Sequence, residues 1–150
     1  MEPRIVEREA FCVLGVAADI DITADDPGAV FEEFIRRRAG IATPSSAPGD
    51  YGVYFESDQP GKVCYLAGME VDVLDEIPEG LVLREVPGAR YAVFGCGIEE
   101  IGKTWRFIHG TWLPDSTQYA LANSPVFEYF PPGARDGKAN ILIHVAVRDR

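Results

Sequence analysis

One carboxylate stands in the middle of an otherwise apolar segment, SPVFEYFPPG, at Glu128. In an extended strand, Val126, Glu128 and Phe130 point to one face and Phe127 and Tyr129 to the other. Because both faces carry large apolar side chains, we expect Glu128 to be shielded from water. Such a carboxylate loses several kcal/mol of solvation unless a cation or hydrogen bonds replace the water, and without them its pKa rises.

Three chemical roles fit a glutamate in this setting. It can be neutralised inside the protein by Arg90, Lys103 or tyrosine hydroxyls. It can be left unpaired so that the positive charge of a ligand completes it, with aromatic side chains adding cation–π attraction. It can also act as a general acid–base, because a raised pKa suits proton transfer near neutral pH. Taken alone, the residue favours internal pairing over ligand binding, and ligand binding over catalysis.

Other patterns of catalysis and metal binding are missing from the sequence. The two histidines, His109 and His144, do not fall at ligand spacing beside any cysteine, so we expect no metal and no cofactor. No Ser-His or Cys-His arrangement and no nearby histidine accompanies Glu128. Three cysteines form no CxxC pair and are expected to be small core residues: Cys12, Cys64 and Cys96.

The charge and hydropathy of the chain argue against two classes of partner. With 24 acidic residues against 14 Lys and Arg, the formal net charge is -10, which repels phosphate backbones and predicts no direct nucleic-acid binding. No segment approaches the roughly 18 apolar residues that span a bilayer. The start MEPRIVERE lacks the apolar core of a signal peptide, so we expect no membrane association and a cytoplasmic location.

Two helices are predicted from apolar spacing and end signals. Asp26 followed by Pro27 is typical of an N-cap and a first helical residue, and Gly40 lies where this helix can stop. A second helix is predicted to end around Trp112-Leu113-Pro114. Its apolar side chains recur every three or four residues and form one stripe: Ile98, Ile101, Trp105, Ile108 and Trp112.

The remaining apolar segments are predicted to be strands. Residues 63–73 alternate, with Tyr65, Met69 and Val73 on the inward side, which is typical of a half-buried antiparallel strand. In the C-terminal strand His144 falls opposite the apolar side, so we expect it to be solvated on the sheet face. That apolar side is made of Ile141, Ile143, Val145 and Val147, and two further extended segments are residues 3–16 and 81–95.

These elements occur twice along the chain. Residues 61–66 align with 137–142, residues 53–55 with 128–130, and residues 12–15 with 92–95. Each half, about 1–75 and 76–150, therefore follows the order strand, helix, strand, strand. We predict an α+β fold in which one antiparallel sheet carries two helices and the halves are related by an approximate two-fold axis. The alignment places Glu128 at the position of Val53.

Four segments, together with the order of the elements between them, resemble the GyrI-like family. They are DYGVYFESD (50–58), LREVPGARYAVFGCGI (83–98), TWLPDSTQYAL (111–121) and SPVFEYFPPGARDGKANILIHVAV (124–147). The family includes stand-alone DNA gyrase inhibitory proteins and the effector-binding portion of AraC- and MerR-type multidrug regulators. The resemblance implies one ligand-binding domain over residues 1–150, with a tandem β-α-β-β fold and a ligand groove between the halves.

The resemblance also implies a role for Glu128. In drug-binding relatives a glutamate on the penultimate strand anchors lipophilic cations, and its position here is Glu128, so ligand capture now ranks above internal pairing. Aromatic side chains line the pocket of those relatives. The candidates here, each of which also fits ordinary core packing, are Trp105, Trp112, Tyr65, Met69, Phe55 and Phe130, with Tyr54, Tyr91 and Tyr129 as weaker choices.

By this resemblance, the expected function is binding of amphipathic aromatic, often cationic, small molecules. Two alternatives stay open: contact with DNA gyrase, and hydrolysis of cyclopropane-containing genotoxins in which Glu128 activates water. Whether the protein is an enzyme is left undecided, with a non-enzymatic binding protein favoured. There is no room before Met1 or after Arg150 for a helix-turn-helix domain, so we do not expect direct transcriptional control by this chain alone.

Overall fold

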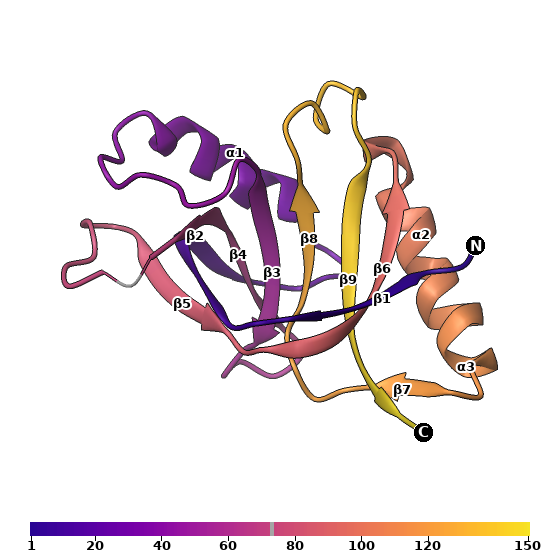
Figure 1. The fold of residues 1–150 in the computed structure, drawn as a ribbon. Helices are drawn as coiled ribbons and strands as arrows, with labels where there is room; N and C mark the ends of the chain where they lie inside the picture. Colours follow the sequence, from indigo (N-terminus) through magenta and orange to yellow (C-terminus); the bar gives the residue numbers. More distant parts are fainter. Residues whose placement is uncertain (73) are drawn as a thin grey trace.

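The predicted order of elements is confirmed in the computed structural model, which describes residues 1–72 and 74–150 (Figure 1). The first half contains β1 (Arg4–Arg8), β2 (Phe11–Ile20), α1 (Pro27–Arg38), β3 (Asp50–Glu56) and β4 (Val63–Val71). The second half contains β5 (Val82–Val86), β6 (Ala89–Cys96), η1 (Ile98–Glu100), α2 (Ile101–Phe107), η2 (Ile108–Trp112), α3 (Leu113–Asp115), β7 (Tyr119–Leu121), β8 (Val126–Phe130) and β9 (Ile141–Asp149).

Several predicted boundaries differ from the observed ones. The segments 3–16 and 81–95 each contain two strands, β1 with β2 and β5 with β6. The strand predicted over 63–73 ends at Val71, and Val73 lies outside the described residues. The second helix ends at Asp115, one residue past the predicted stop at Trp112-Leu113-Pro114.

All strand pairs in the sheet are antiparallel, and their order is β1-β6-β9-β8-β3-β4-β2-β5, with β7 pairing to the end of β9. Outward from the central pair, β3 is followed by β4, β2 and β5, and β8 is followed by β9, β6 and β1. Strands at the same distance from the centre are equivalent in the two halves. The first strand of each half joins the other half, because β1 pairs with β6 and β5 pairs with β2. Each half therefore supplies an edge strand to its partner, and the approximate two-fold of the sequence is present in the sheet.

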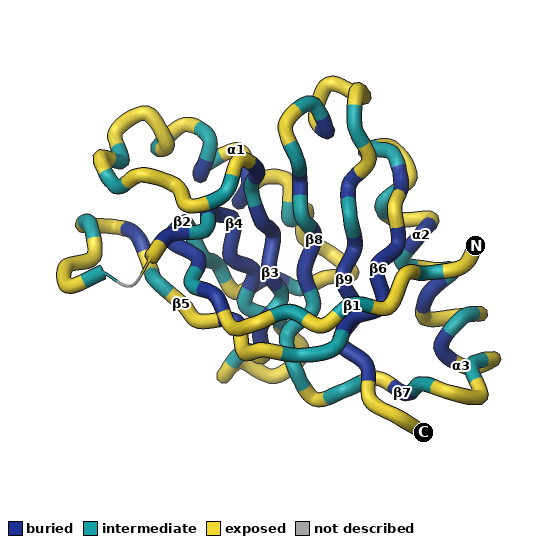
Figure 2. Tube along the Cα trace, in the orientation of Figure 1, coloured by how far each residue is buried: buried dark blue, intermediate teal, exposed yellow. Residues whose placement is uncertain are grey.

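The central strands are buried on both faces, whereas helices and connections carry most of the exposed surface (Figure 2). One face, here called the helix face, packs against α1 over β2 and β4. Over β6 and β9 the same face packs against the α2 segment, which comprises α2, η2 and α3. The other, here called the opposite face, holds a separate core that includes Tyr51, Val53, Phe55 and Phe127. Two layers of core therefore share one sheet.

The register at the centre of the sheet corrects one of the internal alignments. Glu128 pairs directly with Gly52, and Val53 pairs with Phe127 on the opposite face. The alignment of Val53 with Glu128 is thus wrong by one residue, and a one-residue slip moves a side chain to the other face of a strand. The alignment of residues 61–66 with 137–142 is supported by matching turns, because Gly61 and Gly137 have φ of 75° and 76°. Extended to β3, that alignment makes Gly52 the counterpart of Glu128.

His144 is buried rather than solvated, with 8% of its surface exposed. Its ring stacks on Phe127 with centroids 4.2 Å apart, and Nδ1 lies 3.0 Å from the Leu142 carbonyl oxygen. Burial lowers its pKa to about 4. The prediction of a solvated histidine failed because alternation fixes which face a residue occupies, while packing on that face, here by Phe127 and Tyr91, decides whether it meets water.

The start of α1 is confirmed as predicted. The Asp26 side chain accepts a hydrogen bond from the Gly28 amide at 2.9 Å, and Pro27 is the first helical residue, where its missing N–H costs nothing. This cap fixes the direction in which α1 leaves β2, and it places the Asp26 carboxylate at the helix end that faces the centre of the sheet.

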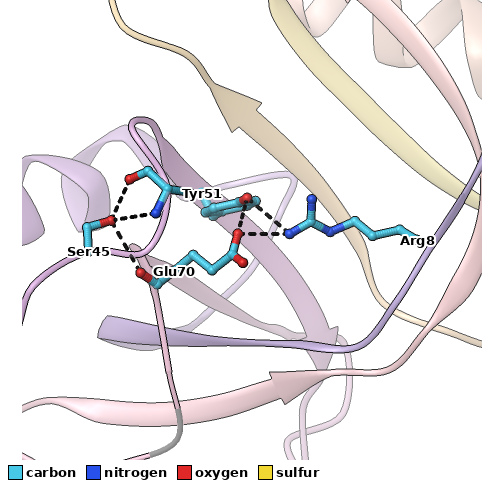
Figure 3. A network of polar contacts seen from close by, with 5 residues as sticks. Arg8, Ser45, Tyr51 and Glu70 are labelled. Atoms are coloured by element: carbon cyan, nitrogen blue, oxygen red, sulfur yellow. Dashed lines mark hydrogen bonds and ion pairs between the residues drawn. The ribbon is translucent and has the colours of Figure 1, made fainter.

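A polar cluster of Arg8, Tyr51 and Glu70 ties the exchanged strand β1 to the first half (Figure 3). Arg8 donates to Glu70 at 2.8 Å and to the Tyr51 hydroxyl at 3.3 Å, and that hydroxyl donates to Glu70 at 2.6 Å. The Arg8 guanidinium also lies 3.9 Å from the centre of the Phe11 ring. Since the partners are part-buried, the loss of one leaves polar groups that water reaches poorly.

We expect Arg8→Met to lower the free energy of unfolding by about 1–3 kcal/mol, because Glu70 and Tyr51 lose their shared partner. Urea denaturation measures this loss. Arg90→Met is the matched control, since the partners of Arg90, Asp149 and Glu7, are exposed; it should cost no more than about 1 kcal/mol. Equal losses in the two variants would contradict a structural role for the Arg8 cluster.

Candidate functional site

Glu128 lies at the middle of β8, on the helix face, with 3% of its surface exposed. Its Oε2 atom accepts a hydrogen bond from the Trp105 indole N–H at 2.8 Å and one from the Tyr54 hydroxyl at 3.3 Å. Its other oxygen, Oε1, accepts none from the described residues. One side of the carboxylate is therefore held by the protein and the other is available.

No cation of the described chain lies within 4 Å of the Glu128 carboxylate. Arg90, proposed above as an internal partner, pairs with Asp149 at 2.7 Å and with Glu7 at 3.9 Å instead, on the outer strands. Lys103 forms no ion pair within the part of the chain that is described. Neutralisation of Glu128 by an internal cation is therefore contradicted, and only the proposed tyrosine hydroxyl, that of Tyr54, is found.

Burial raises the pKa of Glu128 to about 7, and the hydrogen bonds from Trp105 and Tyr54 limit that rise. Both donors stabilise the ionised form, but they do not replace all of the lost water. Near neutral pH the side chain is thus divided between its acid and carboxylate forms. A group of this kind can hold a cation or exchange a proton with a ligand.

Two adjoining cavities meet at Glu128, over the β3–β8 pair where the two halves join. The α1-side cavity has a volume of about 350 Å³ and is lined by Asp26, Pro27, Gly28, Phe31, Glu32, Tyr54, Tyr65, Ile98, Ile101, Glu128, Phe130 and Arg135. The α2-side cavity has a volume of about 530 Å³ and is lined by Ile22, Asp26, Pro27, Tyr54, Val63, Ile101, Gly102, Trp105, His109, Val126 and Glu128. Glu128 and Tyr54 border both cavities.

Aromatic rings form a row along these cavities. Tyr65 and Tyr54 have ring centroids 4.9 Å apart, and Tyr54 meets Trp105 edge to face at 6.1 Å. His109, one helical turn beyond Trp105, stacks on its indole at 5.5 Å. Flat apolar rings next to a carboxylate create a site that suits a flat or delocalised cation.

The glycine opposite Glu128 makes this arrangement possible. A Cβ atom at Gly52 would lie 2.2 Å from the Tyr65 hydroxyl, so any larger residue would force the Tyr65 ring to move. Without a side chain at Gly52, the ring of Tyr65 reaches across β3 into the α1-side cavity. The position that holds Glu128 in the second half thus has no side chain in the first.

The structure brings together some of the residues predicted for the site and separates others. Trp105, Tyr65 and Phe130 line the two cavities with Glu128. Phe55 does not, because the one-residue slip puts it on the opposite face, where the Arg84 guanidinium covers its ring. Met69 pairs with Leu14 and Asp50 and lies in the core under α1, and it lines neither cavity.

Trp112 also lies apart from Glu128, against Phe94 and Tyr119. Trp112 comes seven positions after Trp105, which is about 10 Å further along the helix axis. Between them the π-helical segment η2 holds one more residue per turn, so the apolar stripe predicted from the sequence changes direction. Trp112 instead borders a separate surface cavity of about 440 Å³ beside the N-terminal residues.

The sequence analysis did not select several residues that line the cavities, among them His109, Asp26 and Arg135. Tyr54 was only a weaker choice, yet it touches Glu128; the corrected alignment, which pairs it with Phe130, would have selected it. The sequence analysis placed no histidine near Glu128. His109 follows Trp105 by four residues, however, and residues at this spacing lie on the same face of a helix. The weaker choices Tyr91 and Tyr129 belong to the opposite face.

Two absences hold for residues 1–72 and 74–150. No helix there is both long and apolar enough to cross a membrane. No group of three or more His, Cys, Asp or Glu side chains in those residues is arranged to hold a metal ion.

A family model described as Cass2, integron-associated effector binding protein, matches residues 4–147. The chain is 40% identical over 95 residues to the transcriptional regulator BrlR of Pseudomonas aeruginosa. The matched residues are 63% of this chain and 34% of BrlR. It is 35% identical over 80 residues to the DNA gyrase inhibitor of Escherichia coli K12. The matched residues are 51% of this chain and 50% of that protein. The chain thus matches only a third to a half of the length of these relatives.

The fold is also similar to a solved structure described as SAV2435 bound to tetraphenylphosphonium. The TM-score is 0.78, with 99% of this chain and 94% of that chain covered, and the sequences are 16% identical. At this identity the likeness establishes the α+β fold.

We expect Glu128→Gln to become more stable relative to the wild type as the pH rises from 5 to 8. Burial raises the pKa of Glu128 from its ordinary value of 4.5 to about 7, so the folded protein keeps a proton that the unfolded chain releases. Stability from this group is lost as the pH rises through the folded pKa. The gain in unfolding free energy should be roughly 3 kcal/mol at most, since one pKa unit is worth about 1.4 kcal/mol.

Urea denaturation at a series of pH values measures this difference. Glu85→Gln, an exposed glutamate on β5, is the control and should show no such trend. A difference for Glu128→Gln that is constant over this pH range would contradict a buried, unpaired carboxylate.

Proposed function

Because the chain belongs to the Cass2 family of integron-associated effector binding proteins, we propose that it binds amphipathic aromatic cations with Glu128 as their anchor. This membership and the relatives named DNA gyrase inhibitor confirm the GyrI-like resemblance drawn from the sequence. Effector binding is the activity that the family description gives, and the chemical class of the ligand is our proposal.

The observation that carries the proposal is the Glu128 carboxylate, which is buried without a cation among the described residues. Its burial costs free energy that internal hydrogen bonds offset only in part. A ligand cation placed beside Oε1 would supply the missing charge, and the low dielectric of the cavity would strengthen that attraction. Asp26, which borders both cavities, adds negative potential at their rim.

The aromatic row supports an aromatic rather than a simple inorganic cation. Tyr54, Tyr65 and Trp105 offer ring faces and edges within the same two cavities as Glu128. Each well-placed ring contributes about 0.5–2 kcal/mol to a cation, and apolar area on the ligand adds to it. The structural neighbour SAV2435, described with bound tetraphenylphosphonium, makes that compound a suitable first probe.

A second candidate function is modulation of DNA gyrase. It is favoured by the relatives of that name, of which Escherichia coli K12 provides one at 35% identity. Half of that relative is matched, so its activity does not follow from the match. The negative surface of this chain, with a net charge of -10, is compatible with contact to a protein that binds DNA.

We expect tetraphenylphosphonium to bind the wild type, and Glu128→Gln to weaken that binding by about tenfold or more, because a charge-assisted contact is worth roughly 1.5–3 kcal/mol. Affinity for the wild type should rise between pH 6 and pH 8 as Glu128 loses its proton. The affinity of Glu128→Gln should not change over this range. Isothermal titration calorimetry measures both effects.

Glu85→Gln serves as the matched control, since it removes an equal charge from an exposed strand position. It should leave both the affinity and its pH dependence unchanged. Equal affinities of wild type and Glu128→Gln would remove the anchor from the proposal.

The gyrase candidate is checked separately. If the protein acts on gyrase, the purified chain should inhibit supercoiling of a relaxed plasmid at stoichiometric amounts. Full supercoiling at a large excess of the chain would rule this function out. Repeating the assay with Glu128→Gln shows whether inhibition depends on the ligand site.

A further inference from the structure

Arg135 brings a positive charge to a site that is otherwise acidic. It lines the α1-side cavity together with Glu128, and no Lys or other Arg among the described residues lines either cavity. The α2-side cavity contains no such charge. The two cavities therefore differ electrostatically although they share Glu128.

The guanidinium of Arg135 is only weakly engaged by the protein. Its Nη2 donates to Glu32 Oε1 at 3.5 Å, and the Glu32 side chain is 62% exposed, so water screens this pair. Its central carbon lies 5.1 Å from the centre of the Phe31 ring on α1. A guanidinium has five N–H donors, so most of them stay free for a ligand.

Other acidic groups near Arg135 do not neutralise it. Arg135 also borders a surface hollow that Glu128 does not line and that contains Glu99, Glu100 and Asp136. None of these three carboxylates forms an ion pair with it within 4 Å in the described chain.

The backbone that carries Arg135 is anchored rather than loosely attached. The preceding residue, Ala134, is fully buried, and its amide donates to the Pro131 carbonyl at 3.0 Å. Lys138 closes the same turn by donating to the Gly133 carbonyl at 2.8 Å, with Gly133 at a φ of 87° that favours glycine. A charge on such a turn is preorganised for a ligand.

A tyrosine hydroxyl in the same cavity makes no hydrogen bond with the described residues. Tyr65 is 2% exposed and lines the α1-side cavity, and its hydroxyl makes no hydrogen bond with the described residues. Burial is the main cause that raises the pKa of Tyr65, the Glu128 charge raises it further, and the Arg135 charge lowers it, so the hydroxyl experiences both groups. Because burial keeps it protonated, it is a neutral donor that faces an unfilled space.

We infer that the α1-side cavity receives an acidic group of the ligand, so that the preferred ligands are aromatic zwitterions. The delocalised cation lies at Glu128 and toward Trp105 in the α2-side cavity. The carboxylate of the same molecule pairs with Arg135 and accepts a hydrogen bond from the Tyr65 hydroxyl. This inference rests on the proposed function, since Glu128 remains the anchor of the cation.

The arrangement also explains why the cation and the acid would occupy fixed ends. A second positive charge beside Arg135 is repelled, and a carboxylate beside Glu128 is repelled in the same way. Paired with a guanidinium, a carboxylate gains charge-assisted and often bidentate hydrogen bonds. The ligand would therefore bind in one orientation across the two halves of the protein.

Two fluorescent dyes that differ in one group test the inference. Rhodamine 110 carries a delocalised cation and a free carboxylate, whereas rhodamine 123 is its methyl ester and keeps only the cation. Fluorescence anisotropy at pH 7.5 gives both affinities. We expect the wild type to bind rhodamine 110 about tenfold more tightly than rhodamine 123, as a charge-assisted pair predicts.

Arg135→Gln should abolish this preference, so that it binds the two dyes about equally. Its affinity for rhodamine 123 should stay the same or rise. Arg84→Gln is the matched control, since Arg84 also covers an aromatic ring, Phe55, but on the opposite face. It should keep the full preference. Tyr65→Phe should lower the preference in part.

The outcomes separate this inference from the proposed function. If rhodamine 123 and tetraphenylphosphonium bind in a Glu128-dependent way without preference for rhodamine 110, the inference is overturned and the proposed function stands. A preference that survives in Arg135→Gln also overturns it. If none of the three compounds binds the wild type, both fail together.

Discussion

A carboxylate enclosed among aromatic rings, with no counter-charge from the described residues, is the constraint on which the rest of this structure depends. It requires donors, and Trp105 and Tyr54 supply them to one oxygen only. It requires space beside it, which Gly52 and the two cavities provide. It also requires a scaffold that tolerates an unfavourable burial, because each such group consumes part of a net stability of about 5–15 kcal/mol.

The exchanged strands account for that tolerance. Since β1 completes the second half and β5 completes the first, neither half can open at the centre without also losing an edge strand. The Arg8 cluster adds a polar tie where β1 crosses to the first half. The sheet can therefore hold an unfavourably buried carboxylate where β3 and β8 pair. The apolar cores on its two faces supply the burial that stabilises the sheet.

Much of this architecture is predictable from the sequence, because its signals are local. The Asp26 cap, the alternation in β4 and β9, and the repeated order of elements are each encoded over a few residues. Burial of Glu128 was predicted from its apolar neighbours, and the structure agrees. The membership of Trp105, Tyr65 and Phe130 in its cavities was also anticipated.

The misses share a physical cause, because they depend on strand register and on packing between distant segments. A match of two or three residues cannot distinguish adjacent positions, so Phe55 was chosen where Tyr54 lies. An extra residue in one helical turn redirects Trp112, and no sequence pattern marks it. Closure of the sheet over His144 depends on contacts between distant strands. Arg135 lies in a segment that carries the family resemblance, but only the fold of the turn after β8 brings it to the cavity.

The pairing of Gly52 with Glu128 has a consequence for how such a protein can arise. A lone half would lack its partner's edge strand, and two copies would complete each other as a symmetric dimer. On the axis of that dimer, one residue type would face itself: two glutamates would repel, and two glycines would offer no charge. Two copies within one polypeptide can differ at this position, whereas identical subunits cannot. A single acidic group where the two halves meet is therefore a property that gene duplication permits and identical subunits forbid.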